Sequence, residues 1–297
     1  MTTQVRGGRW RLAAGIAVTA AIGMLAAGPT VFAAGPAAVG LGTAAPFAVL
    51  AGTPAITNTG PTVITGDVGI HPAAAVTGFP PGTVSGTIHA ADAVALQAKS
   101  DLVITYGVAA GLPVTATHGT LGGLTLVGGV YNAGGVVLDL TGTLTLDGQN
   151  DPSSVWVFQA TSALITASSS TVALINGASA CNVFWQVTSS ATLGSNSSFV
   201  GTILALTSIT MGDGVTLNGR ALARNGDVTL IDDTITRPTC AAPSPTPIPG
   251  ATTPPTAMQP STDVPGSGPS PVVFVAIFLI AFVVVANRRS LRLILTR

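Results

Sequence analysis

Short runs of alternating apolar and polar residues fill most of the chain between residues 34 and 240. Val, Ile, Thr and Ser recur at every second position in these runs, and glycines separate one run from the next. A period of two is typical of half-buried strands, and glycine is typical of the turns between them. The sequence therefore predicts a mainly β fold of many short strands.

One segment, from about His89 to Ala109, breaks this pattern. Asp92 lies in its first turn, where a carboxylate favours the helix dipole, and Gly111 with Pro113 ends it. We predict one long helix, about 89–109. Because its apolar stripe is rich in alanine, the helix should lie close along a sheet. The stripe recurs at steps of three and four residues and comprises Ala91, Val94, Ala95, Ala98, Leu102, Tyr106 and Ala109.

The β-rich segments repeat along the chain. Residues 187–201 align with 206–219 at a step of 18 or 19, and 224–236 fit one unit downstream. Residues 160–177 fit one unit upstream with an offset of 27, because 175–183 are inserted. A fixed step of this length predicts the coils of a β-solenoid, although a β-sandwich remains an alternative. The alignment superimposes Thr188 on Thr207, Thr192 on Thr210, Gly194 on Gly212 and Gly201 on Gly219.

The N-terminal 33 residues have the layout of a secretory signal peptide. Three arginines, at positions 6, 9 and 11, precede an apolar stretch from Leu12 to about Ala27, and Val31-Phe32-Ala33 supplies small residues before a cut. An uncleaved anchor is the alternative. We expect residues 34–240 to be the exported domain.

The C-terminal end predicts a stalk and a membrane anchor. Residues 241–271 hold 10 prolines, which favour an extended stalk. Residues 272–286 are 15 consecutive apolar residues; with Asn287 and the small residues before Val272 they are long enough to span a membrane. The basic tail, 288–297, then lies in the cytoplasm by the positive-inside rule. We therefore expect a single-pass protein at the cell membrane with its domain outside. Cell-wall association or secretion are the alternatives, although the Leu-Pro-x-Thr-Gly sorting motif is missing.

Composition and charge narrow the range of functions. The chain is 47% hydrophobic and 7% charged, and its 11 acidic residues are all Asp. Signal and tail hold seven of the ten arginines, so the exported part has 4 basic residues against 11 Asp, a net charge of −7. An exported part this acidic offers no basic surface for nucleic acid.

Cysteines and histidines indicate a disulfide and no metal site. Cys181 and Cys240 are the only cysteines, and both are exported, so we expect them to pair. The three histidines are scattered, and residues 147–151 lack the alternating ligands of a calcium loop. We therefore expect no cofactor.

Four stretches, residues 47–69, 78–102, 181–187 and 203–230, closely resemble the microbial ice-binding-like family. The resemblance covers about residues 41–240. It implies a right-handed, discontinuous β-solenoid of triangular cross-section with one long helix packed alongside. It also implies binding to ice through one flat face, often with the motif Thr-(Ala/Gly)-x-(Thr/Asn), and suggests a monomeric exported domain.

Residues that match or align with this motif are the candidate ice-binding residues. Thr59-Gly60-Pro61-Thr62 fits it, and three tetrads of the coil repeat, beginning at residues 168, 195 and 213, fit it loosely. A threonine methyl excludes liquid water while its hydroxyl joins an ordered water layer. Strand-edge caps are the alternative for each residue. The candidates are Thr59, Thr62, Ser168, Thr171, Ser195, Ser198 and Thr216. We expect Thr62, Ser198 and Thr216 to be exposed.

Two other functions compete with ice binding. Asp232-Asp233, with Asp213 one coil away, could form an acidic patch for acid–base catalysis. No nucleophile elbow, zinc motif or phosphate loop is present, so we expect no enzyme. A cell-surface adhesin or structural envelope module with the same fold is the stronger alternative. It would be favoured by exposed aromatics, but the alternation in residues 155–159 and 183–187 turns several of these inward.

Overall fold

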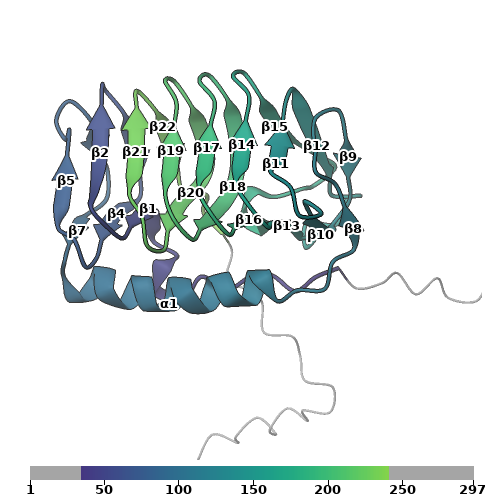
Figure 1. Ribbon diagram of the computed structural model, residues 1–297, viewed down its shortest axis with the longest axis horizontal. Helices are drawn as coiled ribbons and strands as arrows, with labels where there is room; N and C mark the ends of the chain where they lie inside the picture. The colour runs from purple at the N-terminus through teal and green to yellow at the C-terminus, as the bar shows by residue number, and fades with distance from the viewer. Residues whose placement is uncertain (1–34, 241–297) are drawn as a thin grey trace, which may run out of the picture. The chain divides into compact units, whose positions relative to one another are not determined.

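The computed structural model describes residues 35–240 as a stack of β-coils with one helix along its side (Figure 1). All strand pairs in this part of the chain are parallel. Parallel pairing between successive coils confirms the predicted solenoid, because a β-sandwich is built from antiparallel hairpins and Greek keys.

The predicted repeat is also confirmed. Thr192 pairs with Thr210 and Gly201 with Gly219, at the step of 18 residues. Thr171 pairs with Ser198, which is the predicted offset of 27 across the insertion at residues 175–183. A complete coil contributes one strand to each of three faces.

We call the first face the threonine face. It is a separate seven-stranded sheet, seen at the front of Figure 1. Its strands lie in the order β11 (Leu138–Leu140), β14 (Leu164–Thr166), β17 (Ala191–Leu193), β19 (Ile209–Met211), β21 (Val228–Ile231), β2 (Ala55–Thr59) and β5 (Ala75–Thr77).

The second face, which we call the covered face, is buried on both sides. In its central strands one side packs on the solenoid core and the other on the helix, so these strands are buried without alternation, whereas the terminal strands β7 and β8 are partly exposed. It comprises β8 (Ala116–Thr117), β10 (Gly129–Asn132), β13 (Trp156–Ala160), β16 (Val183–Val187), the second halves of β18 (Ser198–Ala205) and β20 (Thr216–Ala223), β1 (Phe47–Ala51), β4 (Asp67–Ile70) and β7 (Ile88–Ala90).

The third face uses the first halves of β18 and β20, which continue around a corner into the covered face. Gly219 lies at this corner, where an added Cβ would lie 1.9 Å from the Gly201 carbonyl oxygen, so no side chain fits. The other strands of the third face are β9 (Thr125–Leu126), β12 (Thr143–Asp147), β15 (Thr171–Ile175), β22 (Thr234–Thr236), β3 (Val63–Thr65) and β6 (Thr83–Val84).

The first coils in the sequence stack on the last ones. β2 pairs with β21, and β3 pairs with β22, although more than four fifths of the described chain separates them in sequence. The helix then runs back along the covered face, and the chain re-enters the stack at β8 (Figure 1). The N-terminal strands therefore extend both the threonine face and the third face.

The helix, α1 (Ala93–Ala110), is shorter at its start than predicted. His89 belongs to β7, so the predicted start was wrong; Asp92 is the N-cap, and its side chain accepts a hydrogen bond from the Ala95 N–H (2.8 Å). Ala91 and Val94 are exposed, which removes them from the predicted stripe. The remaining members are buried against the covered face, namely Ala95, Ala98, Leu102, Tyr106 and Ala109.

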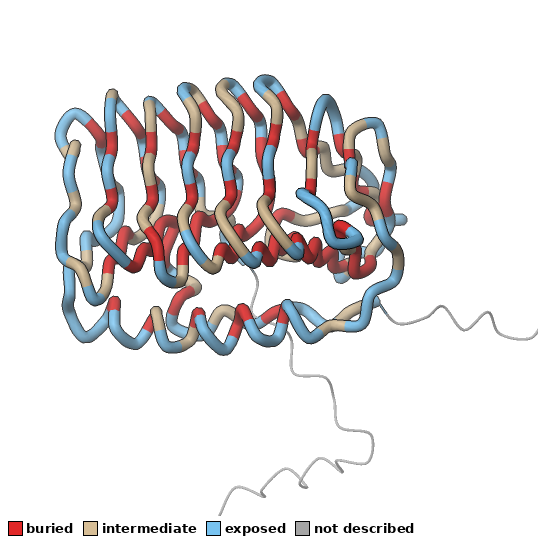
Figure 2. Tube along the Cα trace, viewed as in Figure 1, coloured by how far each residue is buried: buried red, intermediate tan, exposed pale blue. Residues whose placement is uncertain are grey.

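A column of aromatic rings fills part of the solenoid core. Phe158 lies 4.1 Å from Trp185 and 5.6 Å from Tyr131 between ring centroids, and Trp185 lies 4.7 Å from Phe199. The predicted inward orientation of these aromatics is confirmed, since Trp156, Phe158 and Trp185 are fully buried. Figure 2 shows the same alternation of buried and exposed residues along each coil.

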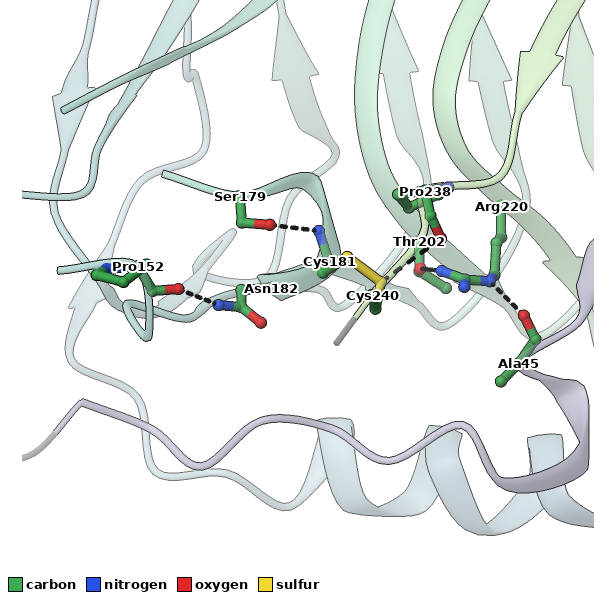
Figure 3. The surroundings of a disulfide bond; sticks show 9 residues. All are labelled: Ala45, Pro152, Ser179, Cys181, Asn182, Thr202, Arg220, Pro238 and Cys240. Atoms are coloured by element: carbon green, nitrogen blue, oxygen red, sulfur yellow. Dashed lines mark hydrogen bonds between the residues drawn. A yellow bond between two sulfur atoms is a disulfide. The ribbon is translucent and has the colours of Figure 1, made fainter. Parts of the chain in front are cut away.

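The expected disulfide joins Cys181 to Cys240 (Figure 3). Cys181 lies in the short 3-10 helix η2 (Ala180–Asn182), where its N–H donates to the Ser179 hydroxyl. The bond fastens the last described residue to the solenoid. A second 3-10 helix, η1 (Gly42–Ala44), precedes β1 and packs on α1.

The predicted signal peptide, stalk, membrane span and basic tail lie outside the described residues. Within residues 35–240, no helix combines the length and apolar character needed to cross a membrane.

Candidate functional site

A row of threonines crosses the threonine face from strand to strand. Thr192 pairs with Thr210, Thr210 with Thr229, Thr229 with Thr57, and Thr57 with Thr77. Each occupies an outward position between inward neighbours. Because paired strands lie about 4.8 Å apart, the side chains repeat at that spacing. We call these five residues the threonine row.

Most hydroxyls of this row remain free to bind water. Within the described residues, the hydroxyls of Thr57, Thr192 and Thr210 make no hydrogen bond to protein, and these three residues are exposed. Thr77 donates to the Ile56 carbonyl at 3.4 Å, and Thr229 to the Asp227 carboxylate at 3.5 Å. The row therefore offers methyl groups and hydroxyls at regular intervals.

Small residues keep the surface beside the row flat. Gly194 and Gly212 occupy the next outward position on β17 and β19, two residues after the row. A Cβ at Gly212 would lie 2.9 Å from the Ser195 backbone nitrogen, so even alanine is disfavoured. On the other side of the row, the corresponding positions are Ser190 and Ser208. Side chains of this size leave Thr192 and Thr210 as the outermost groups of their strands, whereas on β21 the corresponding positions are Asp227 and Ile231.

The threonine face is also the longer uninterrupted array. Every pair of neighbouring strands on it shares at least two paired residues. On the third face, β15 and β18 share a single pair, Thr171 with Ser198, because the insertion after β15 carries the chain away. A continuous ladder of this kind resists the twist of an isolated sheet.

Three predicted site residues lie together, but on the third face. Thr171, Ser198 and Thr216 are consecutive in register at the start of β15, β18 and β20. Ser198 and Thr216 are exposed, and Thr171 is half-buried. The tetrad alignment thus identified a genuine row of hydroxyls, and whether it contacts ice stays a prediction.

The other predicted residues lie at or near the corner between the two faces. Thr59 is exposed at the end of β2, whereas Ser168 and Ser195 lie in the turns that follow β14 and β17. Thr62 is fully buried, so its predicted exposure was wrong. Its hydroxyl oxygen accepts a hydrogen bond from the Asp233 N–H (3.0 Å), which is a structural role.

Buried polar side chains hold this corner in four coils, and Val215 takes the position in a fifth. Ser170 donates to the Ala167 carbonyl (2.7 Å), and Ser197 donates to the Gly194 carbonyl (2.6 Å). Two coils further, Asp233 accepts hydrogen bonds from the N–H groups of Val215 (3.0 Å) and Ile231 (2.9 Å). Each of these polar groups fixes the turn that relates the threonine face to the third face.

Asp233 therefore has a structural use rather than the acid–base role considered above. It is 1% exposed, and both carboxylate oxygens accept from the backbone. Asp213 and Asp232 are exposed at the same corner. Within residues 35–240, no group of three or more His, Cys, Asp or Glu side chains is placed to hold a metal ion.

The shifted pKa values of Asp233, which is buried, and Lys99, which is half-buried, predict that the protein is least stable near neutral pH. Burial, with a smaller effect of Asp213 and Asp232, raises the pKa of Asp233 from 3.8 to about 7. Between those values the folded state holds a proton that the unfolded chain has lost, so the free energy of unfolding falls as pH rises. Burial, with the charge of Arg224, lowers the pKa of Lys99 from 10.5 to about 7. Above pH 7 the unfolded chain holds the extra proton, so stability rises towards pH 10.5.

The measurement is the melting temperature at pH values of about 5, 7 and 9. Carboxylates whose pKa is lowered, such as Asp92 and Asp101, lose their contribution only below 3.8 and do not affect this window. Lys99→Met should remove the rise on the alkaline side and leave the acid side unchanged. A melting temperature that is highest at neutral pH contradicts the prediction.

A rigid face of registered hydroxyls defines a class of protein that recognises an extended, repetitive surface. The chain belongs to the ice-binding-like family, whose model matches residues 49–236. It is 51% identical to an ice-binding protein from Nostoc sp. (strain HG1) over 193 residues, which cover 64% of this chain and 71% of the relative.

The chain is also similar to ice-binding proteins whose structures have been solved. An ice-binding protein from an Antarctic biological consortium is 45% identical, with a TM-score of 0.67, and the match covers 69% of this chain and 93% of that protein. An ice-binding protein from the Antarctic ascomycete Antarctomyces psychrotrophicus is 42% identical, with a TM-score of 0.66 and coverage of 68% and 100%. The mainly β fold with one helix is therefore the fold of this family.

Proposed function

We propose that the protein binds ice through the threonine face. The observation that carries the proposal is the threonine row, in which Thr192, Thr210, Thr229, Thr57 and Thr77 are in register across five strands. Ice has no charge and no protruding group, so its recognition requires a flat surface that matches a lattice of oxygens. The names of the relatives support this assignment, because each is called an ice-binding protein.

The chemistry of the row suits an ordered water layer. Free hydroxyls join hydrogen-bonded water at fixed spacing, while the methyl groups limit competing liquid water. Charged side chains would keep their own hydration shells. Two carboxylates lie on this face. Asp139 is on its end strand, and the half-buried Asp227 precedes β21 beside the row, where it accepts hydrogen bonds from the Ser208 and Thr229 hydroxyls.

Ice-affinity partitioning of the purified protein, together with recrystallisation inhibition, tests the proposed function. The protein should enrich in a slowly grown ice phase, whereas the heat-denatured protein should remain in the liquid. Equal partitioning of folded and denatured protein would contradict ice binding and favour the adhesin alternative. Sugar recognition by exposed aromatics gains no support from the covered strands, where Trp156, Phe158, Phe184 and Trp185 are buried.

We also propose that the domain is displayed at the cell surface, with residues 1–33 removed and 272–287 spanning the membrane. The Pro-rich segment 241–271 and the arginines after the apolar run support this arrangement. The disulfide at Cys240 fastens the domain at the point where the stalk begins. Many tethered copies would bind ice multivalently, so modest affinity of one domain would suffice.

Protease treatment of intact cells tests whether the domain is displayed at the cell surface. The proposal predicts release of a soluble fragment that contains the disulfide and ends within the stalk. Cells that express the chain without residues 272–297 serve as the control and should release the domain untreated. Recovery of the unclipped full domain in the medium of untreated wild-type cells, with none in the membrane fraction, would defeat the idea.

A further inference from the structure

The third face carries a second array of outward side chains in register. Its strands β20, β22, β3 and β6 each place an outward residue at the same level, and the first three place another two residues further along. Polar residues fill all of these positions except one, where Val63 stands. We call the polar members the third-face array: Thr216, Asn218, Thr234, Thr236, Thr65 and Thr83.

The side chains of this array have no partners in the protein. All six residues are exposed, and none makes a side-chain hydrogen bond within the described part of the chain. Their spacing is about 4.8 Å between strands and about 6.6 Å along each strand, so two rows form a grid. The threonine row, with one residue per strand, is regularly spaced only in the direction that crosses the strands.

The surface of the grid is neutral. No charged residue lies in the segments that build it, residues 216–219, 234–236, 63–65 and 83–84. The inward residues between the array positions, Leu217, Ile235 and Ile64, are fully buried in the solenoid core and hold the grid rigid. A rigid, neutral grid of hydroxyls has the same chemistry as the threonine face.

Charged residues separate the two faces. Asp213 and Asp232 are both exposed in the turns between the threonine face and the third face. Their hydration shells interrupt any continuous water layer around the corner. The two surfaces therefore lie in different planes and present their hydroxyls independently.

We infer that the third-face array is a second ice-binding surface, which contacts a different ice plane from the threonine face. The inference rests on the proposed function, since it applies the same recognition chemistry to another face. Ser198 continues the first row onto β18, but Val200, the partner of Asn218, is buried, so the grid of two rows ends at β20. A chain with two such surfaces adsorbs to ice in two orientations and covers more crystal planes.

Fluorescence-based ice-plane affinity tests this inference. The full-length protein carries a fluorescent protein fused after Arg297, and a single ice crystal is grown into its solution. Thr210→Tyr alters the threonine face and Thr234→Tyr the third-face array, and tyrosine is well tolerated in strands. Ser100→Tyr, on the exposed outer side of α1, is the matched control. Melting temperatures should agree among all variants.

The expected pattern separates the two faces. Wild type and Ser100→Tyr should label two sets of planes, each single face variant should lose a different set, and the double variant should label none. Loss of all labelling in Thr210→Tyr, or an unchanged pattern in Thr234→Tyr, overturns the inference and leaves the proposed function intact. Disruption of a dimer by Thr234→Tyr with unchanged labelling also overturns it. A wild-type protein that labels no plane overturns the proposed function itself.

Discussion

Replacing Thr210 with tyrosine is expected to lower recrystallisation inhibition by about tenfold, because central positions of a binding surface dominate its energetics. Thr210 lies on β19, the middle strand of the threonine face, with Thr192 on one side and Thr229 on the other. A phenol ring there would project beyond the threonine methyls and hold the face away from a flat crystal. Residual activity should come from the third face.

The measurement is the lowest protein concentration that prevents growth of ice grains. Ser100→Tyr adds the same ring on α1 and should retain full activity. Both variants should keep the wild-type melting temperature, since the two positions are exposed. If Thr210→Tyr is fully active and stable, the threonine face is not the principal ice-binding surface.

Part of this face was predictable from the coil repeat. The step of 18 residues superimposes Thr192 on Thr210, and the structure pairs exactly those residues. Thr57 and Thr77 extend the row only because β2 pairs with β21, far away in sequence. A repeat that is read along the chain cannot show which end of the stack receives the N-terminal coils, since that depends on closure of the fold.

The two wrong predictions, the exposure of Thr62 and the start of the helix, have similar local causes. Thr62 follows a turn at Gly60, whose φ is +84°, and its position matches Asp233, Ser197 and Ser170 in three other coils. All of these side chains turn inward to satisfy backbone groups, so a motif of four residues does not present its last residue to solvent. The helix start was misplaced because residues 88–90 pair with β4, which outweighs the helix propensity of alanine.

The aromatic core supports both proposed surfaces from within. Trp185 lies on the covered face, and its indole N–H donates to the carbonyl of Val200 on β18 (2.9 Å). Its ring lies between Phe158 and Phe199. Since β18 leads into the third face, this side chain links two faces through the core. Its loss should affect the whole stack.

Trp185→Ala is therefore expected to lower the free energy of unfolding by about 3–5 kcal/mol, the cost of removing a large buried ring and leaving a cavity. Trp185→Phe keeps ring contacts but leaves the Val200 carbonyl without its donor, which should cost about 1–2 kcal/mol. Val103→Ala, on the exposed side of α1, should leave stability nearly unchanged. Urea unfolding followed by circular dichroism gives the three values. A loss below about 1 kcal/mol for Trp185→Ala would show that the core relaxes around the gap, so the stack would not be what keeps the faces rigid.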